Sequence, residues 1–519
     1  MLHTARFPLG CLILWLVAGA APASAASGYG SALPRFALFG WVSPPRESTT
    51  VARYQELAAT GFNVTLPVAD ETGTFADNAL RLDATRPLGI RNLLLDNDLD
   101  SVWAEVPASL ELADRIVARY KDDPAFLGYY LGDEPDSCEF SRLGEWFDIL
   151  RERDPAHPAW NSLLARWSFA TRANFRDHVQ RYVEATHPAV LCNNQYDFTF
   201  GGDMHLLTEN IATLGSVARA NGVPFWGIVQ LMEHWRYRHV TAGMLRWQVA
   251  QWLAWGATGI GYFTYWTPPP EVQVQWEPAM IEWGTGNRTP NYDMVTALNA
   301  RLAPLGNTLA AMQWVRTRHA GSVPPGGVPF TTDSVLTAVE GRATLGWFAD
   351  STFSVFLFVA NADSLLPQQI TLTFSSGCLP SQMRTDGSAW DPLPLDADGR
   401  VVLTPDAGDF TLLRIPVPER LASVTALSGG PMLSLRNTPN PASGLVRFDV
   451  AGAAGPARLD VLDLSGRVIW SRTLAPGACD VTWRGESERA GRAASGLYFA
   501  RLRDARGMVV RRIAWLGGR

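Results

Sequence analysis

The sequence predicts a (β/α)8 barrel followed by two all-β sandwich domains, and three observations carry this prediction. Between residues 35 and 312, short apolar runs alternate eight times with segments that repeat apolar residues every three or four positions. The apolar runs are continuous, as in parallel strands that are buried on both faces. From about Thr317 the helical periodicity stops, and short alternating segments typical of antiparallel sheets follow.

Each apolar run is expected to be a barrel strand, and each amphipathic segment a helix. The expected strands cover residues 36–41, 62–66, 91–95, 126–131, 159–163, 189–193, 224–230 and 259–265. The expected helices cover residues 49–61, 78–89, 108–120, 143–153, 175–186, 206–221, 242–255 and 291–312. Gly222 and Gly256 each follow a helix, at the position where a glycine commonly ends one.

The remainder of the chain is expected to be antiparallel. Residues 317–416 form the predicted β-sandwich, with strands at 344–348, 353–360, 369–374, 401–403 and 410–415. A linker rich in Pro, Ser and Gly covers residues 416–431. Residues 434–519 form a smaller predicted β-module, with strands at 445–450, 457–462, 468–472, 479–483, 496–502 and 509–515.

The first 25 residues have the pattern of a secretory signal peptide. Arg6 precedes an apolar stretch, and Ala23-Ser24-Ala25 fits a small-residue cleavage site. No later apolar run reaches 18 residues, so no transmembrane anchor is expected and the protein is predicted to be secreted or held at the cell surface. Export permits disulfides. Cys138, Cys192, Cys378 and Cys479 allow three pairings, among which the sequence does not choose.

Polar and aromatic residues gather at the expected carboxyl ends of the barrel strands, where such barrels place their active sites. The net charge of −6 argues against a nucleic-acid partner. The rim residues are Trp41, Asp70, Glu71, Asp96, Asp98, Asp133, Glu134, Asn161, Asn193, Tyr196, Asp197, Gln230, Glu233, Trp235, Tyr265 and Trp266. Substrate contacts are expected from Trp41, Asp96, Asn161, Tyr196, Gln230, Trp235, Tyr265 and Trp266. At least two of these aromatic residues are predicted to be exposed.

Several chemistries are excluded by the residue types that the barrel lacks. The only lysine, Lys121, precedes the fourth strand and lies at the wrong end for a Schiff base. The eight histidines include no His-x-His or His-Glu-x-x-His pattern, and nucleotide-binding and Gly-x-Ser-x-Gly motifs do not occur. We therefore expect neither a metal nor a cofactor. Carboxylate chemistry remains, which suits glycoside hydrolysis and a carbohydrate substrate.

Glu134 is the candidate general acid/base. The apolar run that begins at Phe126 ends abruptly in Gly132-Asp133-Glu134-Pro135. Two adjacent acids at a strand tip suit catalysis, and the charge of Asp133 is expected to raise the pKa of Glu134. The alternative is structural: Asp133 caps the next helix and Glu134 interacts with its dipole.

The stretch Gly128-Tyr-Tyr-Leu-Gly-Asp-Glu-Pro135 resembles the fourth-strand motif of clan A glycoside hydrolases, in which Asn-Glu-Pro ends in the acid/base glutamate. The resemblance implies that role for Glu134. Asp133 stands where the clan has an asparagine that contacts the sugar 2-hydroxyl. Similar segments begin at Gln230, Gly256 and Asn291, so the resemblance extends over about residues 35–415.

One residue departs from the clan's pattern. Clan A enzymes place a nucleophilic glutamate at the tip of strand seven, where this chain has Gln230. Glu233 and Glu282 are the nearest replacements, and a solvated loop role for Glu233 is the alternative. The adjacent Asp133 and Glu134 also resemble the pair in substrate-assisted hexosaminidases, which need no protein nucleophile. Catalytic roles are therefore assigned to Glu134, Glu233 and Asp133.

The last module resembles the C-terminal sorting domains of type IX secretion and the Ig-like domain of flagellar hook-capping proteins. The resemblance rests on Thr438-Pro-Asn-Pro-Ala-Ser443, residues 459–467, Val481-Thr-Trp483 and residues 494–502. It implies that export machinery recognises this module. The predicted protein is thus a secreted glycoside hydrolase; alternatives are a surface glycan-binding or adhesion protein, or a structural surface-layer component. The sugar, its linkage, exo or endo action, the stereochemical course and the oligomeric state stay open.

Overall fold

A computed structural model describes two compact units of the chain, within residues 33–415 and 434–515. The described ranges are 33–67, 73–102, 109–271, 274, 276–333, 335–350, 354–415, 434–438, 442–451, 456–463, 468–475, 480–487, 491–493, 496–504 and 508–515. The predicted signal peptide, Asp70, Glu71, the 416–431 linker and Cys479 lie outside them.

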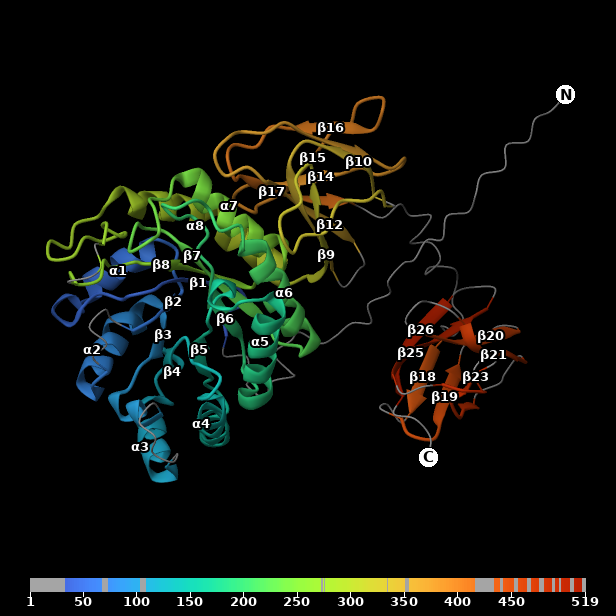
Figure 1. Ribbon diagram of the computed structural model, residues 1–519, viewed down its shortest axis with the longest axis horizontal. Coiled ribbons are helices and arrows are strands. Elements are labelled where there is room, and N and C mark those ends of the chain that lie inside the picture. Colours follow the sequence, from blue (N-terminus) through green and yellow to red (C-terminus); the bar gives the residue numbers. More distant parts are fainter. Residues whose placement is uncertain are drawn as a thin grey trace. The chain divides into compact units, whose positions relative to one another are not determined.

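The first unit begins with eight parallel strands that form a barrel (Figure 1). They are β1 (Ala37–Gly40), β2 (Val64–Thr65), β3 (Arg91–Leu94), β4 (Phe126–Asp133), β5 (Ala159–Ser162), β6 (Leu191–Asn194), β7 (Phe225–Gln230) and β8 (Gly259–Phe263). Their order in the sheet is β5-β4-β3-β2-β1-β8-β7-β6. A single parallel bridge between Leu163 and Asn193, with the Leu163 N–H donating to the Cys192 carbonyl at 2.8 Å, joins β5 to β6 and closes the ring.

Eight helices follow the strands. They are α1 (Val51–Ala59), α2 (Phe75–Thr85), α3 (Leu110–Tyr120), α4 (Phe140–Arg153), α5 (Arg172–Thr186), α6 (Leu207–Ala220), α7 (Ala242–Ala254) and α8 (Pro290–Ala310), with short 3-10 turns at Arg46–Ser48, Arg86–Leu88, Asn97–Val102 and Arg166–Ser168. Six helices begin after a Thr or Ser whose hydroxyl accepts a backbone N–H of the first turn. Such caps satisfy donors that a helix start leaves unpaired.

The barrel interior is packed with large side chains rather than hollow. Phe39, Trp160 and Trp226 are each at most 1% exposed and belong to one inner cluster. Glycine at position 261 makes room for this packing, because a Cβ there would lie 2.2 Å from the Phe39 ring. The interior is therefore a packed core, and barrels of this kind bind their ligands at the carboxyl ends of the strands.

The second part of this unit is a β-sandwich. Its strands are β9 (Gln313–Ala320), β10 (Leu336–Glu340), β11 (Ala343–Ala349), β12 (Val355–Asn361), β13 (Ile370–Phe374), β14 (Ser381–Met383), β15 (Trp390–Pro392), β16 (Arg400–Leu403) and β17 (Phe410–Ile415). One sheet has the order β10-β13-β16 and the other β15-β14-β17-β12-β11-β9. In Figure 1 the sandwich lies against α7 and α8.

Specific polar contacts fix the sandwich to the barrel. The Thr317 hydroxyl donates to the Ala254 carbonyl at 2.7 Å, and Arg246 donates to the Ala407 carbonyl at 2.8 Å. Arg301 of α8 forms an ion pair with Asp409 at 2.9 Å. These contacts involve both α7 and α8, and the barrel and sandwich belong to one compact unit.

The second unit is all-β and has its own hydrophobic core around Trp483 and Trp515. Its strands are β18 (Ser434–Thr438), β19 (Val446–Ala451), β20 (Ala457–Leu462), β21 (Val468–Leu474), β22 (Asp480–Trp483), β23 (Glu486–Ser487), β24 (Gly491–Arg492), β25 (Gly496–Arg503) and β26 (Met508–Trp515). The sheet orders are β18-β19-β22, β21-β20-β25-β26 and β23-β24, all antiparallel.

The predicted fold class is confirmed, and the differences are local. Helix α2 begins at Phe75 rather than at 78, because the Thr74 hydroxyl caps it. The strands that were not predicted are β9, which begins at Gln313 shortly after α8, and β10, β14, β15, β18, β23 and β24. Cys138, Cys192 and Cys378 are free thiols. Within the described residues, no helix is long and apolar enough to cross a membrane.

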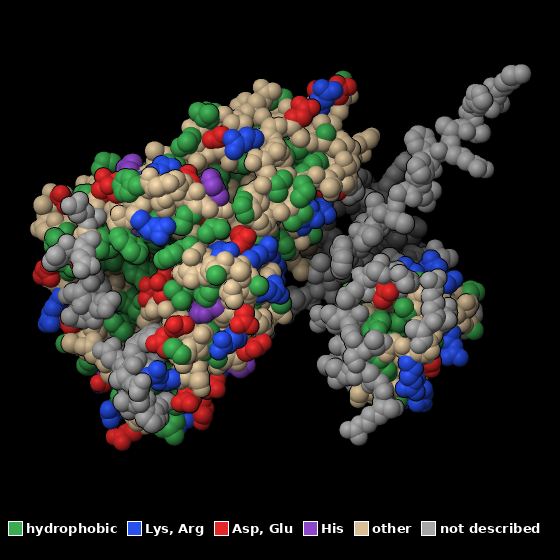
Figure 2. Space-filling model, viewed as in Figure 1, with side chains coloured by type: hydrophobic (Ala, Val, Ile, Leu, Met, Phe, Trp, Pro, Cys, Tyr) green, Lys and Arg blue, Asp and Glu red, His purple; other side chains and the backbone are tan. Residues whose placement is uncertain are grey.

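Charged side chains are mixed on the visible surface of the first unit. Figure 2 shows Lys and Arg side chains scattered among acidic ones, without a continuous basic area on the described part of that face.

Candidate active site

The tip of β4 is a β-bulge. Tyr130 pairs with Trp160 and Asp133 pairs with Ser162, so two residues of β4, Leu131 and Gly132, lie opposite the single residue Asn161 of β5. Gly132 has φ 97°, a conformation that favours glycine. Its carbonyl accepts from the Asn161 amide at 2.9 Å, and the Glu134 N–H donates to the Ser162 carbonyl at 2.8 Å. Bulges of this kind redirect side chains beside active sites.

The bulge brings both carboxylates close to the end of β6. In a regular strand, adjacent side chains point to opposite faces. Here the negative charges of both Asp133 and Glu134 act on Tyr196. Burial and these two charges together raise the pKa of Tyr196 well above its usual value. Asp133 is exposed and Glu134 is partly buried. The two acids therefore share one location but differ in their environment.

Burial raises the pKa of Glu134 above its usual value, and a side-chain hydrogen bond from Asn194 partly opposes this effect. Burial disfavours the charged carboxylate, whereas the amide donor stabilises it. The charge of Asp133 is not among the causes of the shift, so the expected mechanism for the raised pKa was wrong although its direction is the expected one. A raised pKa favours the protonated carboxyl group that general-acid chemistry requires.

Backbone strain gathers at the same end of the barrel. Among the described residues, non-glycine residues with positive φ are Val42, Glu134, His187, His205 and Trp235. All of these except His187 follow a barrel strand on the side where the strands end. Non-glycine residues in this conformation cost about 1–3 kcal/mol each and persist where the surroundings impose them, commonly at functional sites.

Glu233 lies in the loop after β7, where its contacts are with that loop and the next. Its carboxylate accepts the His239 N–H at 3.2 Å, and its carbonyl accepts the Glu277 N–H at 3.1 Å. Its side chain is partly buried. Glu282, the other candidate, accepts from the Thr285 hydroxyl at 2.5 Å within its own loop. Both acids therefore have loop-bracing contacts.

Gln230 is fully buried and holds loops together rather than facing a ligand. Its side-chain amide donates to the Arg238 carbonyl at 2.8 Å and to the Phe198 carbonyl at 3.2 Å. Its backbone exchanges hydrogen bonds with the side chain of Gln248. The amide at the tip of strand seven thus positions the loops that follow β6 and β7.

Two of the five aromatic rim residues are accessible and three are buried. Trp235 is 65% exposed, and Trp41 is partly exposed and packs against Tyr130 and Trp160. Tyr196, Tyr265 and Trp266 are at most 6% exposed. After β8 the chain runs beside β1, with the Tyr265 N–H donating to the Trp41 carbonyl at 2.8 Å, and this turns Tyr265 and Trp266 into the core.

Other expected contact residues have structural partners. Asp96 is buried, accepts from the Tyr120 hydroxyl at 2.5 Å and pairs with Arg119 at 2.9 Å. Asn161 is buried and supports the Gly132 carbonyl. Asp197 accepts the Leu207 N–H at 2.9 Å at the start of α6, and burial raises its pKa to about 6.

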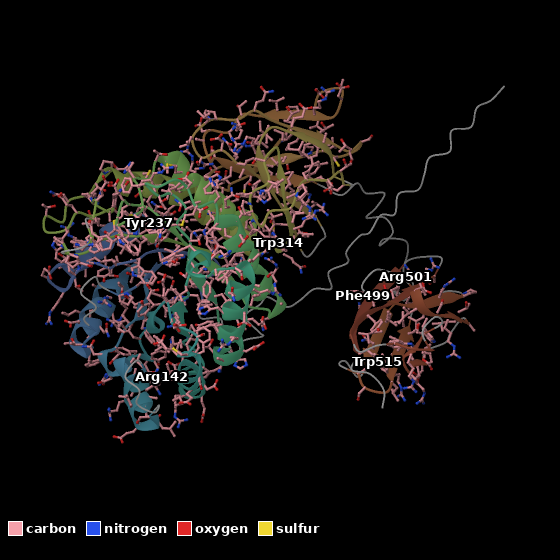
Figure 3. The ribbon with its side chains drawn as sticks, in the orientation of Figure 1. Arg142, Tyr237, Trp314, Phe499, Arg501 and Trp515 are labelled. Carbon is pink, nitrogen blue, oxygen red and sulfur yellow. The ribbon has the colours of Figure 1, made fainter. Side chains whose placement is uncertain are left out.

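Two residues at the site were not among the predicted ones. Asn194 ends β6 and forms a side-chain hydrogen bond with Glu134. Tyr237, labelled in Figure 3, lies in the loop after β7, within electrostatic reach of Glu134. Asn194 directly follows a predicted strand end, so its position alone was a usable signal. Tyr237 lies seven residues beyond β7, where sequence spacing gives no orientation.

No group of acidic, histidine and cysteine side chains that could hold a metal occurs within the part of the chain that the structure describes. The cavities of about 440 and 560 Å³ lie beside α8, the first against the sandwich and the second against α7. Neither is lined by Asp133 or Glu134.

The sequence matches no protein-family model and no curated protein. Similar solved structures include a family 39 glycoside hydrolase from the gut symbiont Bacteroides cellulosilyticus, with 11% identity over 74% of this chain and 81% of that one, at a TM-score of 0.47. A family 5 glycoside hydrolase from Bacteroides vulgatus has 13% identity over 75% of this chain and 90% of that one, at a TM-score of 0.46. We draw no catalytic role from these likenesses.

Proposed function

We propose that the protein is a secreted glycoside hydrolase and that Glu134 is its general acid/base. The observation that carries the proposal is the bulge at the tip of β4, which holds a protonation-prone glutamate beside Asn194 at the barrel mouth. The acid would protonate the leaving oxygen of a glycosidic bond. Asp133, exposed next to it, offers a second carboxylate for charge stabilisation or for orienting the substrate.

Glu134→Gln tests this role directly. We expect hydrolysis to fall about 10²–10⁴-fold on substrates with poor leaving groups, because a positioned proton donor is lost. Purified protein is assayed against a panel of 4-nitrophenyl glycosides and soluble polysaccharides, and circular dichroism checks its folding. If Glu134 serves only the next helix, turnover stays normal and stability falls by no more than about 1 kcal/mol. That result removes Glu134 from the mechanism.

Chemical rescue distinguishes whether Asp133 or Glu233 is the second catalytic carboxylate. Asp133→Ala and Glu233→Ala are assayed with and without azide, which replaces a missing nucleophile and yields a glycosyl azide of inverted configuration. An azide product from Glu233→Ala assigns the nucleophile to Glu233. If neither variant gives this product while Asp133→Ala loses activity only on 2-acetamido sugars, substrate assistance by Asp133 is supported.

A non-catalytic glycan-binding protein is the second candidate, and one observation favours it. Strand seven ends in the buried amide of Gln230, and the carboxylate of Glu233 already accepts a loop N–H. In that case the wild-type protein binds a polysaccharide in the panel, and Glu134→Gln binds it equally well without any product from either protein.

We also propose export through the N-terminal signal and the C-terminal unit. The motive is the signal pattern of residues 1–25 and the resemblance of residues 434–519 to sorting domains. Mature protein should begin at Ala26 by N-terminal sequencing. A chain truncated near Pro431 should keep its sugar activity but fail to reach the cell surface; a truncated chain that reaches the surface normally contradicts this assignment.

A further inference from the structure

Two of the most exposed aromatic side chains of the barrel lie on neighbouring loops at its mouth. Phe200, in the loop after β6, is 64% exposed, and Trp235, in the loop after β7, is 65% exposed. Both loops leave the carboxyl ends of their strands. Exposing large apolar side chains is costly in water, and clusters of them mark interaction sites.

The two loops are tied together by their backbones. Thr199 and Tyr237 form an antiparallel bridge, the Phe200 N–H donates to the Arg236 carbonyl at 3.1 Å, and the Arg238 N–H donates to the Phe198 carbonyl at 3.1 Å. An ion pair between Arg238 and Asp203 at 3.0 Å adds a side-chain link. These links fix the positions from which Phe200 and Trp235 project.

A third loop contributes Trp167, in the 3-10 turn after β5. The guanidinium of Arg236 lies 5.5 Å from the centre of the Trp167 ring and 6.0 Å from that of Tyr237. Trp167 is partly exposed, and its backbone N–H donates to the side-chain oxygen of Gln195 at 3.2 Å. We call Trp167, Phe200, Trp235 and Arg236 the aromatic rim.

Tyr237 interacts electrostatically with both Arg236 of the aromatic rim and Glu134. Burial raises the pKa of Tyr237 to about 12; the charge of Arg236 opposes this rise, and the charge of Glu134 adds to it. Tyr237 therefore lies within electrostatic reach of both Arg236 and Glu134. The loops that carry the rim and the tip of β4 that carries Glu134 both lie at the carboxyl end of the barrel.

We propose that the aromatic rim binds sugar units of a glycan chain beyond the bond at Glu134, so that the substrate is an oligosaccharide or polysaccharide. This proposal rests on the proposed function. Sugar rings present C–H faces that pack on aromatic rings, and their hydroxyls accept hydrogen bonds from a guanidinium. A glycan is favoured over a protein partner because the rim lies at the same end of the barrel as the carboxylates Asp133 and Glu134.

The kinetic test compares long and short substrates. Trp235→Ala combined with Phe200→Ala should lower kcat/KM at least tenfold for the longest oligosaccharide that the wild type cleaves. Phe200→Ala alone, at a residue outside the expected substrate contacts, should stay within about twofold of wild type on a 4-nitrophenyl monoglycoside, because that substrate does not reach the rim. Equal losses on both substrates, or no loss on either, overturn the proposal.

A binding test keeps the proposal separate from catalysis. Full-length protein is run in native gels containing xylan, mannan, laminarin, carboxymethylcellulose or starch. Retardation that the double variant loses supports the rim, even if no glycoside is hydrolysed and the enzyme assignment therefore fails. If no polysaccharide retards the wild type and no oligosaccharide is cleaved faster than the monoglycoside, the rim proposal fails.

Two controls define the nature of the contact. Trp235→Phe keeps an aromatic face and should retain most of the retardation, whereas Trp235→Leu keeps apolar area without a ring and should not. Leu379→Ala, at a 75% exposed leucine in the sandwich, should behave as wild type. If the double variant instead converts a dimer to a monomer in light scattering, the rim is a contact between copies and the glycan proposal is wrong.

Discussion

The guanidinium of Arg219 lies 3.6 Å from the centre of the ring of Trp314, which is labelled in Figure 3, and this contact joins α6 of the barrel to β9 of the sandwich. Trp314 also stacks on Trp255, and its indole N–H donates to the Ala254 carbonyl at 3.1 Å. Burial lowers the pKa of Arg219 to about 10, and the Trp255 carbonyl accepts one of its N–H groups at 3.2 Å. A partly buried cation over an indole ring is thus part of the barrel–sandwich interface.

Arg219→Ala should destabilise the first unit by about 2 kcal/mol, because a desolvated cation–π contact and its carbonyl hydrogen bond are lost. Thermal unfolding followed by tryptophan fluorescence measures the change. Arg176→Ala, on the exposed face of α5, is the matched control and should stay within about 0.5 kcal/mol of wild type. Equal stability of Arg219→Ala and wild type would show that the stacking contributes nothing.

Gly132→Ala should impair the site more than the fold. A side chain at φ 97° is strained and should shift the bulge that aims Asp133 and Glu134. We expect a loss of about 1 kcal/mol in stability and a marked fall in kcat. Gly89→Ala imposes similar strain at φ 68°, in open space on the opposite side of the barrel. It should lower stability comparably and leave kcat unchanged; parallel loss of activity in both variants contradicts a specific role for the bulge.

Asn194→Ala should move the alkaline limb of the pH–activity profile to higher pH. A general acid must be protonated, so activity falls as pH rises through the pKa of Glu134. The Asn194 hydrogen bond lowers that pKa, and its removal raises it further. The profile of kcat/KM on one aryl glycoside measures the shift, with Asn307→Ala in α8 as the control. A limb that stays in place, or moves to lower pH, rules out this contact as a determinant of the pKa.

Asp460→Asn should destabilise the second unit alone. Asp460 is buried and accepts from Ser471 at 2.7 Å, from Arg458 at 2.8 Å and from Arg501 at 2.7 Å (Figure 3 labels Arg501). Burial raises the pKa of Asp460, but these donors outweigh burial and lower it below its usual value. Its stabilising effect is therefore present above the usual aspartate pKa and is lost as pH falls through the depressed one.

We expect Asp460→Asn to cost about 1.5–3 kcal/mol at neutral pH, the value of hydrogen bonds to a charged group. Denaturant unfolding of the full chain should show the second unit melting earlier and the first unit unchanged. Asp449→Asn, at an exposed position of β19, is the control. A loss that does not shrink as the pH is lowered through the acid range would mean that the effect does not come from the carboxylate charge.

The periodic parts of the fold could be predicted from the sequence, because burial imposes a regular pattern on strands and helices. All eight barrel strands and helices follow from that pattern, and so does the tip of β4. The orientation of residues beyond a strand end does not, because it depends on the next chain segment. Tyr265 turns inward because its N–H donates to the carbonyl of Trp41, some 220 residues earlier in the chain.

The aromatic rim illustrates the same limit of sequence reasoning. Trp235 was expected at the mouth from its spacing after strand seven, but Phe200 and Trp167 were not. Their proximity comes from the bridge between Thr199 and Tyr237 and from the Arg236 side chain reaching Trp167. Loop pairing of this kind leaves no periodic signal in the residues that form it.

The barrel is closed between β5 and β6 by one bridge, whereas every other neighbouring pair of strands shares at least two paired positions. This junction lies between β5, whose Ser162 carbonyl accepts the Glu134 N–H, and β6, which carries Asn194. A small separation of β5 from β6 would move the Glu134 carboxyl group away from the Asn194 amide and leave the other strand pairs intact. The backbone pairing of the barrel is therefore sparsest beside the carboxyl group that is proposed to donate the proton.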